Sequence, residues 1–237
     1  SFKPIKPIVT MERPILEQAL LSTHIPLFYG AMPNLGLYSQ PDGPFPNPAE
    51  LLPRGKIKEA QDSYEATVDA AVNDILYVSK GMHESGADGI NLDTVGAAGD
   101  ADFQASLMAA EKLRETYPDI CIELGMAGEF ILGMHSELEY DGARLAGLYP
   151  HDQVKLAQKA GVTIFGPVVN TNTSESCPWN LSRAITFMKE CSRVATIPIH
   201  VNMGMGVGSV TVTDHPPIDI VSRASKAMVE ICRLDGL

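Results

Sequence analysis

Short apolar runs of β-type residues alternate with longer helical patterns along most of this chain, and this alternation restricts the fold more than any other feature. The runs are nearly continuous in Val, Ile, Leu and Phe, which is typical of parallel strands that are buried on both faces. We expect strands at 25–29, 89–92, 120–124, 162–165, 197–201 and 234–237.

Helical patterns fill the intervals between these runs. An apolar stripe with helical spacing predicts a long helix over 56–82. Further helices are expected at 100–117, 151–159, 178–194 and 217–232, where Pro, Gly and short polar residues mark the ends. The spacing between successive strands suits a series of βα units.

A regular βα series of this kind predicts an α/β fold of the (β/α)8 TIM-barrel type, incomplete here, with about six of the eight βα units present. A doubly wound open sheet is the alternative. Its nucleotide-binding members carry a Gly-rich turn after the first strand, and the residues at 29–33, Tyr-Gly-Ala-Met-Pro, do not form such a turn. We therefore predict a single partial barrel domain over 1–237.

One proline-rich segment interrupts this rhythm. Residues 30–53 hold six of the 17 prolines, a composition that argues against a helix or a central strand. Loops of this length inside compact domains are usually functional. We expect an ordered, lid-like loop over the strand ends, and a flexible insertion is the alternative.

Charge and cysteine content narrow the classes of function. The formal net charge is −11, and an acidic chain repels phosphate backbones and anionic lipid, so we expect neither nucleic-acid nor membrane-surface binding. No run approaches the roughly 20 apolar residues that span a bilayer. The four cysteines are far apart and form no C-x-x-C motif, which is typical of reduced thiols in a cytoplasmic protein.

Polar residues gather at the expected carboxyl ends of strands, where barrel enzymes place their chemistry. Glu123 lies inside an apolar strand, where an unpaired carboxylate is costly, so it is either an acid, base or cation anchor or one half of a structural pair. Asp93 leaves an earlier strand in a similar position. His200 is a candidate general base or ligand, or else a satisfied core group, and Asn202 follows it.

Two other features give weaker indications. No cluster of His, Cys and Asp has the spacing of metal ligands, so we expect no bound metal. The glycines of 204–208 are spaced as in a phosphate-binding loop, but no Lys or Arg lies among them. Tight packing, or the close approach of a large flat ligand, explains these glycines equally well.

Several long motifs resemble one known family, the methanogen-type dimethylamine:corrinoid methyltransferases, which belong to the pyrrolysine-containing methylamine methyltransferases. The resemblance extends over essentially all of 1–237. The motifs that carry it are Ile25-Pro-Leu-Phe-Tyr-Gly-Ala-Met-Pro-Asn34, Gly125-Met-Ala-Gly-Glu129, Gly166-Pro-Val168 with Asn170-Thr-Asn-Thr173, His200-Val-Asn-Met-Gly-Met-Gly-Val-Gly208, and Pro216-Pro-Ile-Asp219 with Arg223-Ala-Ser-Lys-Ala-Met-Val-Glu-Ile231.

The resemblance implies a barrel enzyme that moves one methyl group from dimethylamine to the Co(I) corrinoid of a partner protein, in methylamine-dependent methanogenesis or methylotrophy. It implies that the corrinoid is carried by the partner rather than bound directly. It also implies a pyrrolysine, encoded by an in-frame amber codon, just after Leu237, whose ring imine would bind the amine. The expected partners are the cognate corrinoid protein and dimethylamine, and we expect a homo-oligomer.

An imine–amine adduct needs a nearby acid or base and a set of hydrogen-bonding groups. By position, the best candidates are Glu123, Asp93, His200 and Asn202, and we expect Glu123 to handle protons. Two alternatives remain, a catalytically inactive amber-truncated fragment and a homologue without pyrrolysine that uses another methyl donor. The residues expected to face the substrate or the corrinoid are Glu129, Asn170, Asn172, Met203, Gly204 and Gly206.

Overall fold

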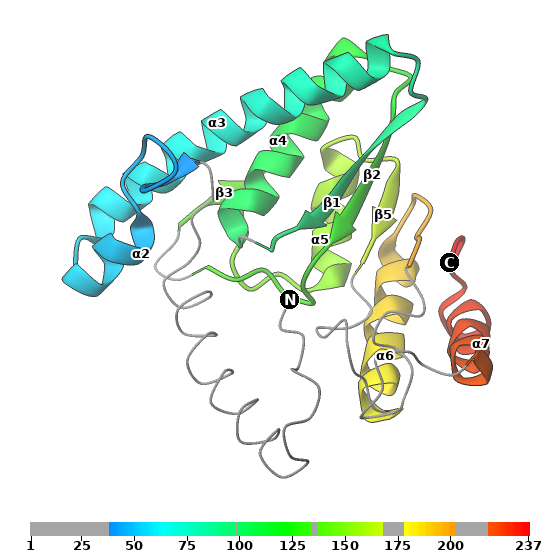
Figure 1. The fold of residues 1–237 in the computed structure, drawn as a ribbon. Coiled ribbons are helices and arrows are strands. Elements are labelled where there is room, and N and C mark those ends of the chain that lie inside the picture. The colour runs from blue at the N-terminus through cyan, green and yellow to red at the C-terminus, as the bar shows by residue number, and fades with distance from the viewer. Residues whose placement is uncertain (1–37, 98, 134–136, 168–177, 202–217) are drawn as a thin grey trace, which may run out of the picture.

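The computed structural model describes residues 38–97, 99–133, 137–167, 178–201 and 218–237. Within these residues the chain is a mixed α/β protein whose helices pack beside a parallel sheet (Figure 1). The strand predicted at 25–29 lies outside the described residues, as does the first part of the proline-rich segment.

The predicted elements that the structure describes occur in the predicted order. The strands are β1 (Gly89–Val95), β2 (Cys121–Met126), β3 (Glu139–Tyr140), β4 (Ala143–Arg144) and β5 (Ile164–Gly166). The helices are α2 (Pro48–Leu51), the 3₁₀ turn η3 (Leu52–Arg54), α3 (Ile57–Glu84), α4 (Asp100–Thr116), α5 (Pro150–Lys159), α6 (Pro178–Val194), α7 (Ile218–Ala227) and the π-helical turn η4 (Met228–Cys232). Of these, α2, η3 and the short antiparallel pair β3–β4 are additional elements that the sequence analysis missed.

The main sheet is parallel and its strands neighbour one another in chain order, β1-β2-β5. Two isolated parallel bridges continue this order, from Phe165 to Ile199 and from His200 to Gly236. The strands predicted at 89–92, 120–124 and 162–165 are confirmed, and those predicted at 197–201 and 234–237 are present as these bridges. Among the described residues the sheet is open, and it is not closed into a barrel.

The prediction that the strands are buried on both faces is wrong for this sheet. Burial alternates along β2, where Ile122, Leu124 and Met126 are buried and the residues between them are only partly buried. Along β1, Ile90 is buried while Asn91 is exposed. The reason is that successive side chains point to opposite faces, and in the part of the chain that the structure describes the helices of the main core pack on one of these faces.

The covered face forms the main hydrophobic core. Side chains of α4, α5 and α6 pack together with this face in one cluster, and α5 lies behind the strands in Figure 1. Its largest fully buried side chains are Phe103, Leu107, Leu113, Ile120, Ile122, Leu124, Ile131, Leu145, Phe165, Met188 and Ile199. This packing fixes which strand face remains available for chemistry.

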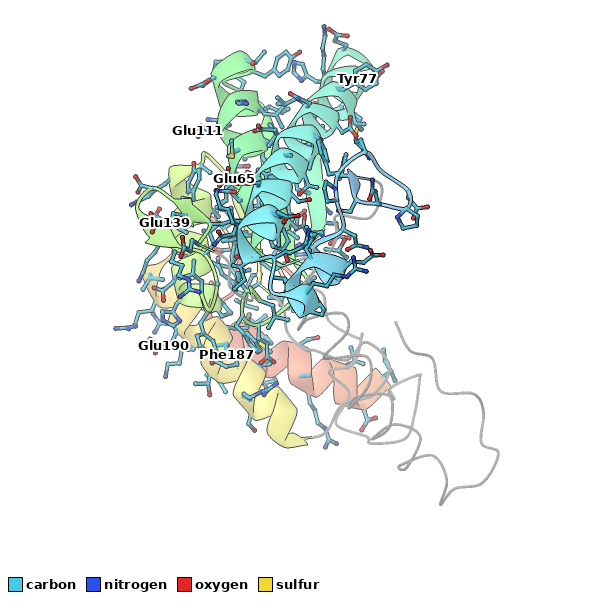
Figure 2. All side chains as sticks on the ribbon, turned by 90° about the vertical axis from the view of Figure 1, so that its left-hand side faces the viewer. Glu65, Tyr77, Glu111, Glu139, Phe187 and Glu190 are labelled. Carbon is cyan, nitrogen blue, oxygen red and sulfur yellow. The ribbon has the colours of Figure 1, made fainter. Side chains whose placement is uncertain are left out.

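A second, smaller core joins α3 to α4. Tyr64, Val68 and Val72 of α3 pack against alanines of α4, which allow the two helices to approach closely. Figure 2 shows Glu65 and Glu111 on this side of the molecule and Tyr77 near the C-terminal end of α3. The apolar stripe expected over 56–82 therefore forms a real interface, although Tyr77 is 81 % exposed.

The proline-rich segment contains helix that we did not expect. Pro48 opens α2, since the first helical turn needs no hydrogen bond from its nitrogen, and the Asn47 side chain caps the helix by accepting from the Ala49 N–H at 2.9 Å. Ser63 of α3 donates a hydrogen bond to the Pro46 carbonyl at 2.6 Å. The described part of this segment is thus ordered and held to α3, and its role as a lid stays a prediction.

The helix predicted at 217–232 changes character before it ends. Its last turn, η4, is π-helical, and the chain then leaves it through Arg233 in the left-handed conformation, at φ 55°. Met228 and Cys232, the first and last residues of this turn, are buried. No helix among the described residues has the length and apolar content that a membrane span requires.

Candidate functional site

The face of the sheet opposite to the main core carries, among the described residues, polar side chains and glycines together with Ile164. Because residues two apart in a strand share a face, Glu123 and Gly125 of β2 lie on the side opposite to the hydrophobic core. Asn91 of β1 pairs in register with Glu123. Gly166 of β5 pairs with Gly125. We call this surface the polar face.

The closest contact on the polar face joins Glu123 to His200. Glu123 Oε1 lies 2.5 Å from His200 Nδ1, and the two side chains are 25 % and 42 % exposed. A carboxylate accepts the Nδ1 proton of the imidazole, and this leaves Nε2 free to take up or release a proton. The sequence identified both residues, but it did not pair them.

This contact spans a whole strand. Glu123 is on β2, and His200 follows the bridge from Phe165 of β5 to Ile199, so β5 lies between the two residues. Neighbouring strands lie about 4.8 Å apart, and the two side chains therefore have to meet above β5. On this face β5 carries Ile164, in register with Glu123, and Gly166.

A glycine also makes room beside Asp93. A Cβ added at Gly125 would lie 3.0 Å from Asp93 Oδ1. Asp93 itself is exposed, and its Oδ1 accepts a hydrogen bond from the Thr94 N–H at 2.7 Å. The register between β1 and β2 shifts after Leu92, and Thr94 takes a positive φ of 55°. This irregular strand end turns the carboxylate toward β2.

Asn91 is a member of the polar face that sequence reasoning missed. It is exposed and lies opposite Glu123 in the parallel register. A Cβ added at Gly125 would lie 3.9 Å from Asn91 Oδ1, so the amide is close to the same glycine as Asp93. The signal was present in the sequence, because Asn91 precedes Asp93 by two residues and must share its face.

Glu129 has a different environment. It is 3 % exposed, and its Oε1 accepts from Arg183 Nη2 of α6 at 2.7 Å. Burial raises the pKa of the Glu129 carboxyl, while the charge and hydrogen bond of Arg183 act in the opposite direction. Its carboxylate ties the loop after β2 to α6, and a direct contact with substrate or corrinoid stays a prediction.

The remaining predicted site residues lie in the part of the chain that the structure does not describe. They are Asn170, Asn172, Asn202, Met203, Gly204 and Gly206. Within the described ranges, no group of three or more His, Cys, Asp and Glu side chains is arranged to hold a metal ion.

The polar face combines two chemical abilities. Asp93 and Glu123 present carboxylates that attract a cation, and the imidazole of His200 provides a second ring nitrogen, Nε2, that can donate or accept a hydrogen bond. The glycines at 125 and 166 allow the Asp93 side chain and the neighbouring strand backbones to pack closely on this face. A small protonated amine is a chemically suitable ligand for such a surface.

Comparison with known families gives one match that covers the full chain. Residues 1–237 match the family model described as dimethylamine methyltransferase (Dimeth_PyL). No solved structure matches the chain.

Proposed function

Because this chain belongs to the dimethylamine methyltransferase family, we propose that its reaction moves one methyl group from dimethylamine to the Co(I) corrinoid of a separate corrinoid protein. The proposal includes a (β/α)8 barrel, a pyrrolysine that receives the amine, and a homo-oligomeric enzyme. The consecutive parallel order of β1, β2 and β5, continued by the two bridges, supports the barrel.

The observation that carries the proposal is the contact between Glu123 and His200 on the polar face of the sheet. Dimethylamine is protonated near neutral pH, and the carboxylates of Glu123 and Asp93 attract the resulting cation. His200 Nε2 remains available for a proton because Nδ1 is occupied by Glu123. Asn91 adds an amide that can orient the amine nitrogen.

Methyl transfer breaks a C–N bond, and the bonding electron pair stays on nitrogen. The protonated nitrogen departs as neutral methylamine, so the enzyme has to hold a proton on that nitrogen until the bond breaks. The reduced corrinoid, when bound, supplies the electron pair that receives the methyl group. The protein residues keep the amine protonated, oriented and shielded from competing water.

The test is a methyl-transfer assay with the full-length gene product purified from its native host. Reduced corrinoid protein and dimethylamine are mixed with the enzyme, and methylamine release is measured together with the corrinoid absorbance. We expect transfer with dimethylamine and not with methanol. Transfer from a different methyl donor, with none from dimethylamine, would contradict the proposal.

The role of Glu123 is tested in the same assay. Glu123→Gln keeps the shape of the side chain but removes its charge, and we expect a loss of about 10²- to 10⁴-fold in the rate of methyl transfer. Glu115→Gln is the matched control, since Glu115 is an exposed carboxylate on α4. Equal activity of the two variants would remove Glu123 from the mechanism.

A further inference from the structure

We propose that Asp235 and Gly236 are positioning residues that hold the imidazole of His200 against Glu123. The catalytic consequence of this inference rests on the proposed function, but the geometry of the pair does not. Both residues follow η4 and lie beside the segment that carries His200.

Asp235 forms hydrogen bonds with both the backbone N–H and the backbone carbonyl of Ile199, the residue before His200. Its Oδ2 accepts a hydrogen bond from the Ile199 N–H at 2.9 Å, and its own N–H donates to the Ile199 carbonyl at 3.1 Å. A hydrogen bond to a charged acceptor contributes more than a neutral one. One side chain therefore fixes the backbone from which the His200 ring projects.

Gly236 holds the residue after His200. The Val201 N–H donates to the Gly236 carbonyl at 3.2 Å, and the Gly236 N–H donates to the Ile199 carbonyl at the same distance. On the other side of the segment, the His200 N–H donates to the Phe165 carbonyl at 3.0 Å. The backbone of His200 is thus held from both neighbouring segments.

The missing side chain of Gly236 is as important as its backbone bonds. A Cβ added there would lie 3.2 Å from His200 Cδ2 and 3.7 Å from His200 Cγ. Cδ2 and Nδ1 are on opposite edges of the imidazole, and Glu123 holds the Nδ1 edge. The ring is therefore confined between the Glu123 carboxylate and the backbone of Gly236, and a methyl group at 236 would require the ring to shift by a few tenths of an ångström from this position.

A second Asp-Gly pair provides an internal comparison. Gly89 opens β1 next to Cys121, just as Gly236 lies next to His200. Asp88 and Asp235 are both exposed, but within the described residues the Asp88 carboxylate accepts no backbone hydrogen bond like the one that Asp235 accepts from the Ile199 N–H. Both copies lie beside a residue of the polar face, but within the described residues only Asp235 holds the neighbouring segment with its carboxylate.

The experiment uses the full-length enzyme with ¹⁵N-labelled histidine. The Nδ1 proton of His200 should give a strongly deshielded NMR signal that disappears in Glu123→Gln, which assigns it. We expect Gly236→Ala and Asp235→Ala to lose this signal, and Asp235→Asn to keep it because its amide oxygen still accepts from the Ile199 N–H. Asp88→Ala is the matched control and should keep the signal.

Activity gives the second measurement. We expect Gly236→Ala and Asp235→Ala to lower kcat for methyl transfer about 10- to 100-fold with little change in KM for dimethylamine. Asp235→Asn should retain most of the activity. Circular dichroism checks that each variant folds. If Gly236→Ala does not fold, the comparison of Asp235→Ala with Asp235→Asn tests the positioning role by itself.

The outcomes separate this inference from the proposed function. An unchanged Nδ1 signal in Asp235→Ala or in folded Gly236→Ala would overturn the positioning role, whatever the activity. Loss of the signal in an enzyme that shows no methyl transfer from dimethylamine would leave the positioning role standing and refute the proposed reaction.

Discussion

The two faces of the central sheet differ in burial and in the kinds of residue that they carry. On the covered face, Ile122, Leu124 and Phe165 are fully buried against helices. On the polar face, the intervening residues of the same strands are Cys121, Glu123 and Gly125 of β2 and Ile164 and Gly166 of β5, and Glu123 contacts His200 across β5. One residue along a strand separates a position governed by packing from one that is free to carry chemistry.

This contrast explains how a short strand serves stability and chemistry at once. Apolar burial on one face stabilises the fold by roughly 25 cal/mol for each Å² removed from water. The other face contributes little to that burial, so carboxylates and an imidazole can remain there without a large cost in stability. Each of the following predictions compares the two faces.

The thiol behind the sheet should be far less reactive than an ordinary cysteine. Burial raises the pKa of Cys191 to about 12 from its usual value of 9.0, which lowers the thiolate fraction at neutral pH about a thousandfold. Cys121 is only partly buried and lies on the polar face. In the folded protein, peptide mass spectrometry after alkylation should show Cys121 labelled well before Cys191. The reverse order would mean that the two faces have been assigned wrongly.

Neighbouring residues of β2 should differ strongly when they are substituted. Ile122→Ala leaves a cavity in the main core and should lower the free energy of unfolding by about 2–5 kcal/mol. Glu123→Gln should change it by less than about 1 kcal/mol because that side chain is partly exposed. Chemical denaturation of the full-length protein measures both. Equal losses would show that the polar face is also part of the core.

A methyl group at Gly166 should disturb the polar face from within. A Cβ there would lie 3.2 Å from Gly125 Cα and 3.4 Å from the His200 carbonyl oxygen, so strand backbones would have to move. We expect Gly166→Ala to lower the free energy of unfolding by about 1–3 kcal/mol.

Gly81→Ala on α3 is the control for this substitution. No atom lies within 4 Å of a Cβ added at Gly81, and alanine favours the helix. We therefore expect this variant to be as stable as the wild type or slightly more stable. If chemical denaturation shows that Gly166→Ala is also as stable as the wild type, the close packing of β2 and β5 does not require a glycine at position 166.

The buried Glu129 should give the protein a pH-dependent stability. Its pKa is raised in the folded state, mainly by burial, so the folded protein holds this proton more tightly than the unfolded chain does. Stability should therefore decrease as the pH rises from about 4.5 through the raised pKa, and this contribution levels off above it. Denaturation midpoints across this range should show the slope in the wild type and a smaller slope in Glu129→Gln. An identical slope in the variant would assign it to other groups.

The smallest change in stability is expected at Asn91. Because it is exposed, Asn91→Ala should alter the free energy of unfolding by no more than about 0.5 kcal/mol. If Asn91 orients the amine, methyl transfer should nevertheless fall, with the effect mainly on kcat. Unchanged transfer would limit the working part of the polar face to Asp93, Glu123 and His200.

Much of the secondary structure could be predicted from periodicity and end signals. The helices predicted at 100–117, 151–159 and 178–194 correspond to α4, α5 and α6, since their apolar stripes and prolines act locally. The sequence analysis argued against a helix in the proline-rich segment, and the signals for α2 that it missed are also local. Proline excludes the interior of a helix, but it is favoured in the first turn, and Asn47 was the capping signal.

The sequence alone determined the alternating order of strands and helices and the chemical character of Glu123 and His200, because these depend on residues close together in the chain. The tertiary structure alone decided that, among the described residues, burial is confined to one face of the sheet and that these two residues meet on the other. They are separated by 77 positions and an intervening strand. Their contact depends on the parallel register of strands that are far apart in the chain, and no local pattern specifies that register.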